Sequence, residues 1–200
     1  MTSPSDDVRL ARTHGHADTW RETPLPPRPR KLVALHWLTV LCLVAGVTLV
    51  LARDQLDGRV VRGWLLEGHR YFGLIVLLLF VVRVALRVRL GKLPSHGDSP
   101  KLLRILAGLT HVLLYALLLA LPLLGWTLSN AGGKPVDFLG IRLPALVGPD
   151  EDLADTLQAW HVDLAWLLLG VASVHFAGAL WHHFVRRDGV LRTMLPRRRR

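Results

Sequence analysis

Four long apolar segments alternate with short polar stretches along this chain of 200 residues. They cover approximately residues 32–52, 64–86, 102–128 and 153–184. Since about 20 apolar residues cross a bilayer as an α-helix, each segment is long enough to form a membrane span. The first segment is longer than the apolar core of a signal peptide and lacks an Ala-x-Ala cleavage pattern, so we expect it to be retained. The pattern predicts an all-α integral membrane protein built as a four-helix bundle.

The polar remainder predicts a tail at each end of the bundle. Residues 1–31 contain four prolines between positions 24 and 29 and show no apolar periodicity, which is typical of a disordered or polyproline-like tail. We expect the transmembrane domain at residues 32–185 and a basic tail at residues 186–200. In the loop 130–152, glycine and proline indicate turns, and Asp152 is expected to cap the fourth helix.

The uneven distribution of basic residues predicts an orientation in the membrane. The net charge is +10, and 18 of the 25 lysines and arginines lie in the two tails or in the linker 87–104. The positive-inside rule therefore predicts that both termini and this linker are cytoplasmic. The arginine run at 197–200 also suggests nucleic-acid binding, but directly after a membrane helix we interpret it as a topology anchor that contacts lipid headgroups. We expect membrane lipid and no nucleic acid as a partner.

Cys42, the only cysteine, lies inside the first predicted span. A single cysteine excludes an intramolecular disulfide, and the chain has no Cys-x-x-Cys-His motif for covalent haem attachment. Any haem in this protein would therefore be of the b type, held by axial ligands and packing.

Four histidines within the predicted spans are the main candidates for chemistry. His36 lies in the first span, His69 in the second, and both His161 and His175 in the fourth. An imidazole in hydrocarbon is costly unless it faces the bundle interior and finds a partner, so several of them favour a buried cofactor. Fourteen residues complete nearly four helical turns and rise about 21 Å, so the two histidines of the fourth span point in nearly the same direction at different depths.

Depth then suggests how the four histidines pair. With the predicted orientation, His36 and His175 lie in the cytoplasmic half of the membrane, whereas His69 and His161 lie near its external face. The sequence predicts two b-type haems, one with the axial ligands His36 and His175, the other with His69 and His161. Each haem would join two helices of the bundle.

Two further residues in the spans are candidates for contact with these groups. Arg83 follows His69 by fourteen residues, which places it level with the cytoplasmic haem, where it pairs either with a propionate or with lipid headgroups. His111, early in the third span, competes with His36 or His175 as a ligand, but we interpret it as a residue that contacts a ligand or a quinone.

Several segments resemble the prokaryotic cytochrome b561 family, over roughly residues 30–197. The segments that carry the resemblance are LHWLTVLCL, GHRYFGLIVLLLFVVRVALRVRL, HVLLYALLLALPLLGW, LVGPD and, above all, VHFAGALWHHFVRRDGVLRTMLP. The resemblance implies a four-helix bundle in the bacterial inner membrane with two haems b, whose axial ligands are His36, His69, His161 and His175. It further implies electron exchange with the quinone pool, and in one type of member the oxidation of superoxide with ubiquinone as the acceptor. The chain departs from the family in its longer basic N-terminus and in Arg70, where the family often has lysine.

Three functions remain open at this stage. An iron with two axial imidazoles has no vacant position, so the first is quinone-linked outer-sphere electron transfer, with superoxide as one electron donor. External cations would steer that anion despite the acidic Asp54 and Asp57 among them: Arg53, Arg59, Arg62 and Arg70. The second function is a haem-bearing anchor for a dehydrogenase or hydrogenase, against which the short external loops argue. The third is a histidine-lined metal transporter, which would need carboxylates or thiols near the histidines.

Overall fold

The structure, a computed structural model, describes residues 29–91, 101–187 and 190–195, and its helices form the four predicted spans. The four long helices are α2 (Arg30–Gln55), α3 (Arg59–Leu90), α4 (Lys101–Ala131) and α5 (Glu151–Trp181). Each is long and apolar enough to cross a membrane. The four-helix membrane fold is therefore confirmed, whereas the orientation of the termini stays a prediction. Of the tail predicted at residues 1–31, residues 1–28 lie outside the described residues, and Arg30 and Lys31 form the start of α2.

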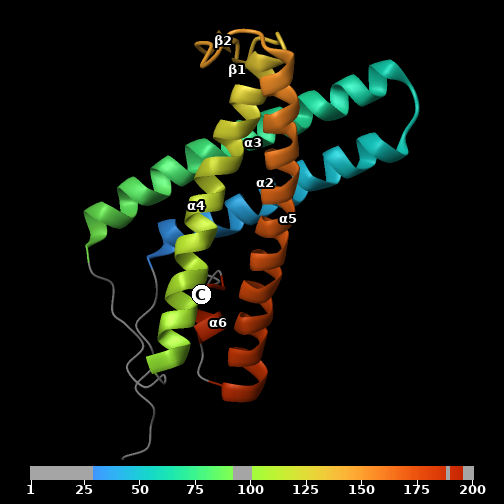
Figure 1. The fold of residues 1–200 in the computed structure, drawn as a ribbon. Helices are drawn as coiled ribbons and strands as arrows, with labels where there is room; N and C mark the ends of the chain where they lie inside the picture. The colour runs from blue at the N-terminus through green and yellow to red at the C-terminus, as the bar shows by residue number, and fades with distance from the viewer. Residues whose placement is uncertain (1–28, 92–100, 188–189, 196–200) are drawn as a thin grey trace, which may run out of the picture.

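The four helices form two hairpins. Helix α2 packs along α3, and α4 packs along α5, while the described part of the chain shows less packing between α3 and α4. Helix α5 has no extended backbone packing with α2 or α3 among the described residues. Figure 1 shows the α2–α3 hairpin crossing the α4–α5 hairpin at a steep angle. The hairpins therefore meet at a crossing, and most helix contact is within each hairpin.

The buried apolar side chains follow the same division. One cluster, Cys42, Val76 and Leu79, lies between α2 and α3. A second cluster lies between α4 and α5 and consists of Leu117, Leu121 and Leu168. Only Leu157 and Leu168 are buried among the residues of α5, so most of this helix lies outside the two clusters.

The connection between α4 and α5 contains a small β-hairpin. Strand β1 (Asp137–Phe138) pairs antiparallel with β2 (Ile141–Arg142). The two turn residues, Leu139 and Gly140, both have positive φ, 51° and 80°, as a two-residue hairpin turn requires. The ring of Phe138 lies 6.2 Å from that of Tyr71, so the hairpin packs on α3. The sequence predicted turns here and missed the strands.

Helix α5 begins one residue after Asp150. The Asp150 Oδ1 atom accepts a hydrogen bond from the Leu153 amide at 2.9 Å, and Asp150 has an extended backbone. The expectation that Asp152 caps this helix is therefore wrong. Asp152 instead lies in the first turn, where its negative charge interacts favourably with the helix dipole.

The chain reverses direction after α5. The π-helical turn η1 (His182–Arg186) continues α5, and Arg187 has a left-handed backbone with φ 54°. The short helix α6 (Val190–Thr193) follows, and the Trp37 Nε1–H group donates to the Met194 carbonyl at 2.6 Å. Part of the segment 186–200, interpreted above as a tail, is therefore folded against the start of α2.

Candidate functional site

Two pairs of histidine rings bring the two hairpins together. His36 of α2 and His175 of α5 have ring centres 6.3 Å apart. His69 of α3 and His161 of α5 have ring centres 6.1 Å apart. These are the two pairs that helix depth suggests. They lie where α5 faces α2 and α3 without extended backbone packing.

The spacing within each pair fits one metal ion between two imidazoles. A metal–nitrogen bond to imidazole is about 2.0 Å, and the ring centre lies about 1.1 Å beyond that nitrogen, so two ligands in line have centres about 6.2 Å apart. The observed values, 6.3 and 6.1 Å, agree with this separation. The planes of each pair are inclined by 78° and 79°, so the rings are not stacked on one another. Both sites therefore fit an iron with two axial imidazoles.

Hydrogen bonding orients His69 for such a role. Its Nδ1 atom lies 2.9 Å from the Gly46 carbonyl oxygen. Because a carbonyl oxygen only accepts, Nδ1 carries the hydrogen and Nε2 keeps its lone pair. In a metal-binding histidine, a hydrogen bond from the ring nitrogen that does not bind the metal fixes the orientation of the ring and raises the basicity of the other nitrogen. In contrast, His161 Nδ1 is buried and makes no hydrogen bond of comparable geometry within the described residues.

Two glycines on neighbouring helices leave room for these rings. A Cβ at Gly46 would lie 3.9 Å from His69 Nδ1, and a Cβ at Gly125 would lie 3.3 Å from His161 Cε1. Neither glycine was predicted from the sequence. A glycine inside an apolar helix at the depth of a candidate ligand is the signal that points to them.

A side chain at position 125 is expected to displace the His161 ring. Gly125→Val places methyl groups beyond a Cβ that is already within 3.3 Å of the ring, so the variant should lose most of the haem at the His69–His161 site. Gly170→Val is the matched control, since a Cβ at Gly170 meets nothing within 4 Å. Haem content per chain, measured by pyridine haemochrome, is the readout. Equal haem content in the two variants would contradict the close approach of Gly125 to a ligand.

His111 lies close to His175, as its place in the third span allowed. The two ring centres are 5.1 Å apart, which is shorter than the separation of about 6.2 Å for two ligands of one ion. The exposed His111 ring donates from Nδ1 to the Ala107 carbonyl at 2.6 Å. The geometry therefore favours His36 as the partner of His175, with His111 as a neighbour of that pair.

Arg83 points into the bundle at the level of His36 and His175. Its Nη1 atom lies 3.5 Å from His36 Nδ1, at the outer limit of a hydrogen bond, and its Cζ lies 5.4 Å from the ring centre of Tyr115. The side chain is half-buried, whereas Arg87 and Arg89 on the same helix are exposed. Arg83 is thus placed to face a group held by His36 rather than the lipid headgroups.

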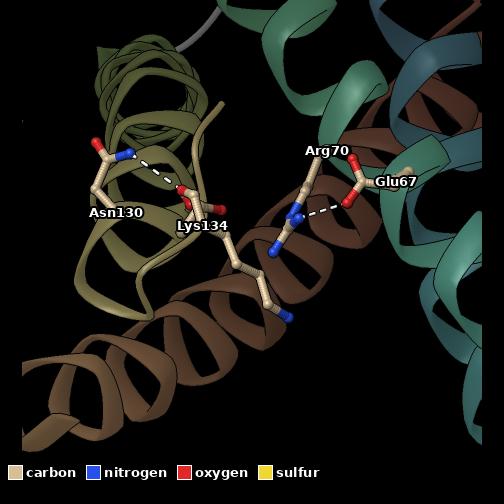
Figure 2. Close-up of polar contacts among 6 residues, drawn as sticks. Glu67, Arg70, Asn130 and Lys134 are labelled. Carbon is tan, nitrogen blue, oxygen red and sulfur yellow. Dashed lines mark hydrogen bonds and ion pairs between the residues drawn. The ribbon is translucent and has the colours of Figure 1, made fainter. Parts of the chain in front are cut away.

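The external cations differ in how far they are neutralised. Arg53 lies 3.6 Å from Asp54, and Arg70 lies 2.5 Å from Glu67. Figure 2 shows Arg70 turned toward Glu67 on α3, and Lys134 in the loop after α4, where its carbonyl oxygen accepts from Asn130. Among the described residues, Arg59, Arg62 and Lys134 are exposed and form no ion pair. Lys134 was not predicted from the sequence as one of these cations.

The described residues contain no group of three or more histidine, cysteine, aspartate or glutamate side chains that could hold a metal ion. A metal transporter would need carboxylates or thiols beside its histidines, and no cluster of that kind is found in this part of the chain. The geometry is that of two separate imidazole pairs.

Comparisons with known proteins agree with this arrangement. The model of a family described as prokaryotic cytochrome b561 matches residues 28–197. A protein of Yersinia pestis named "Probable superoxide oxidase CybB" is 30% identical over 170 residues, which cover 84% of this chain and 94% of that protein. "Cytochrome b561 homolog 1" of Escherichia coli is 32% identical over 173 residues, or 84% of this chain and 96% of that protein. "Cytochrome b562" of Cereibacter sphaeroides is 32% identical over 185 residues, or 86% and 98%.

Proposed function

Because this chain belongs to the prokaryotic cytochrome b561 family and is thereby a membrane-embedded electron-transfer protein that binds haem b, we propose that it carries electrons from its external face to the quinone pool through two such groups. The observation that carries this proposal is the presence of two histidine pairs, each spaced for one iron. Their members on α5 are separated by about 21 Å along the helix, so the two sites lie at different depths.

Each residue has a defined role in this proposal. His69 and His161 would hold the external group, and His36 and His175 the group nearer the predicted cytoplasmic face. When bound, the haems supply reversible one-electron chemistry between ferric and ferrous iron. With two imidazoles as ligands, the iron at each site would have no coordination position left for oxygen, so the role of the protein would be to position and insulate the electron path.

We propose superoxide as the external electron donor and ubiquinone as the acceptor. In the balanced reaction two superoxide ions are oxidised to two oxygen molecules, and one ubiquinone takes up two electrons and two protons to give ubiquinol. The unpaired cations Arg59 and Arg62 lie at the beginning of α3, at the same end as His69, and Lys134 lies beyond α4. Their charge would attract a small anion toward this end. The name of the Yersinia pestis relative supports the same substrate.

A rapid-mixing experiment tests the donor. Purified protein in proteoliposomes is mixed with a superoxide source, and the haem absorption bands are followed before and after ubiquinone is added. We expect prompt reduction by superoxide and reoxidation by ubiquinone. If superoxide leaves the haems oxidised while ubiquinol reduces them, the superoxide proposal is wrong, and the chain then exchanges electrons with a quinol or with a dehydrogenase or hydrogenase for which it is the membrane anchor.

Removing the external positive charges should slow the reduction of the haems by superoxide and not their reoxidation by ubiquinone. Arg59→Gln with Arg62→Gln is expected to lower the rate of reduction by superoxide about tenfold at low salt, because steering depends on charge near the entry site. The matched control, Arg87→Gln with Arg89→Gln, removes the same charge from the other end of α3 and should leave the rate unchanged. Raising the ionic strength should narrow the difference between wild type and variant, since salt screens steering. Equal rates for the two double variants would contradict steering by Arg59 and Arg62.

A further inference from the structure

We propose that Trp126 of α4 binds the haem at the His69–His161 site, with its indole N–H group donating a hydrogen bond to a haem propionate. This inference rests on the proposed function, which places a haem between these two histidines. It adds a residue from a third helix to the site, since the pair on α3 and α5 supplies only the axial ligands. Trp126 would hold one edge of the group and partly neutralise its charge.

Trp126 differs from the other tryptophans in the described part of the chain. All the others are exposed, as is typical of tryptophans at a membrane interface: Trp37, Trp64, Trp160, Trp166 and Trp181. The Trp126 side chain is half-buried, and its Nε1 atom is buried without a hydrogen-bond partner among the described residues. Its N–H group is therefore not the wet polar end that an interfacial tryptophan presents to headgroups and water.

A buried indole N–H group needs an acceptor. The group only donates, and nearly every buried polar group in a folded protein has a hydrogen-bond partner. Two buried polar side chains in the next turn of α4 follow this rule. The Ser129 hydroxyl donates to the Gly125 carbonyl at 3.0 Å, and Asn130 Oδ1 accepts from the Leu146 amide at 2.9 Å. Trp126 is the exception among these three, so we expect its N–H group to meet an acceptor in the haem-loaded protein.

The position of Trp126 places this donor beside the His69–His161 site. Trp126 follows Gly125, at which a Cβ would lie 3.3 Å from Cε1 of the His161 ring. Consecutive Cα atoms are about 3.8 Å apart, so Trp126 is attached directly next to the point where α4 contacts this ligand. The His161 ring cannot be the acceptor once it binds iron, because one ring nitrogen is then coordinated and the other carries the hydrogen.

The propionates are the acceptors that a haem offers to this donor. The four pyrrole nitrogens bind the iron, and the methyl and vinyl groups of haem b are apolar, so only the two carboxylates accept strong hydrogen bonds. A hydrogen bond to a carboxylate is charge-assisted and stronger than one between neutral groups. Figure 2 shows that Arg70, the cation next to His69 in the chain, is turned toward Glu67. Its charge is therefore partly neutralised, which leaves more of the propionate charge to donors such as Trp126.

Trp126→Phe tests the hydrogen bond, because it keeps an aromatic ring and removes the N–H group. We expect the ferric–ferrous equilibrium of the haem at the His69–His161 site to shift about threefold toward ferric iron, since the propionate keeps more of its negative charge. The midpoint potential then falls by about 28 mV, because a tenfold change corresponds to about 59 mV. The other haem should not shift. Trp160→Phe is the matched control, since Trp160 precedes His161 in the chain but is 57% exposed.

Infrared spectroscopy separates the hydrogen bond from a change in packing. The difference spectrum between oxidised and reduced protein is recorded with haem that carries ¹³C in its propionate carboxyl groups. The carboxylate stretching band should shift in Trp126→Phe and stay in place in Trp160→Phe. In wild-type protein with ¹⁵N-labelled tryptophan, one indole N–H resonance should be shifted downfield and should change with the redox state of this haem. That measurement decides the question if Trp126→Phe is purified without the haem.

Three outcomes would overturn the proposal. The first is a Trp126→Phe variant whose potential and carboxylate band equal those of the wild type. The second is an equal shift in Trp126→Phe and Trp160→Phe, and the third is wild-type protein without an indole resonance that responds to the haem. If the wild-type protein holds two haems in these cases, the proposed function stands without this hydrogen bond. Wild-type protein that carries no haem at the His69–His161 site would overturn both.

Discussion

His161→Ala should reduce the haem content of the purified protein to half and leave the second haem in place. The same result is expected for His69→Ala, because the two rings lie 6.1 Å apart and are proposed to hold the same haem. His36→Ala or His175→Ala should remove the other haem. With one axial ligand lost, the remaining imidazole and the surrounding packing are too little to retain a non-covalent group through purification. Haem per chain is measured by pyridine haemochrome, and the redox titration identifies which of two potentials has disappeared.

His111→Ala is the control that makes this experiment decisive. The His111 ring lies only 5.1 Å from His175, yet its Nδ1 is held by the Ala107 carbonyl and the ring is exposed. We expect the His111→Ala variant to keep both haems. Loss of a haem in this variant, with none lost in His36→Ala, would show that the pair is His111 with His175. Recovery of haem in His161→Gly when imidazole is added would separate loss of a ligand from loss of folding.

The histidine pairs and the four spans could be inferred from the sequence because simple physical rules determine both. The length of the four apolar segments alone predicts the spans, since few structures other than a membrane helix require so many consecutive apolar residues. The repeat of the α-helix then places His161 and His175 on nearly one face. Depth selects His69 and His36 as their neighbours, and the structure brings these rings to 6.1 and 6.3 Å. Neither rule depends on how the helices pack.

The steep crossing of the hairpins could not be inferred in this way. It depends on which side chains of Leu43, Leu117 and Leu168 interlock, and helix periodicity leaves that choice open. The turn after α5 was missed for a different reason. Its sequence is basic and has no apolar repeat, so it looks like a tail, and its main anchor joins Trp37 to Met194 across 157 positions of the chain.

The start of α5 shows a finer limit of prediction. Asp150, Glu151 and Asp152 are adjacent, and each has a side chain that is favourable in or before the first turn of a helix. Only the backbone distinguishes them: Asp150 is extended, and its carboxylate accepts from the Leu153 amide. Which of these neighbouring acids caps the helix is determined by the loop before it. That loop is held by tertiary contacts such as the hydrogen bond from the Leu146 amide to Asn130 Oδ1.

Arg83→Gln should lower the midpoint potential of the haem at the His36–His175 site by on the order of 60 mV and leave the other haem unchanged. The half-buried guanidinium lies beside His36 and over Tyr115, so its charge acts on this site alone. A nearby positive charge opposes the extra positive charge of ferric iron, and an unneutralised propionate favours ferric iron, so removal of the arginine stabilises the oxidised form by both routes. A tenfold change in a one-electron equilibrium corresponds to about 59 mV. Potentiometric titration of the two haem bands measures the shift.

The size of this shift and its restriction to one haem decide whether Arg83 pairs with a haem propionate or with lipid headgroups. Arg87→Gln removes the same charge from an exposed position one helical turn further along α3 and should shift neither potential, because water and salt screen it. Arg83→Lys keeps the charge with a different geometry and is expected to recover most of the potential. If Arg83→Gln and Arg87→Gln titrate like the wild type, Arg83 acts as a lipid-facing cation despite its inward position. If both haems shift together, the effect comes from the overall charge of the protein. A shift of one haem alone requires that Arg83 lies next to the group held by His36 and His175.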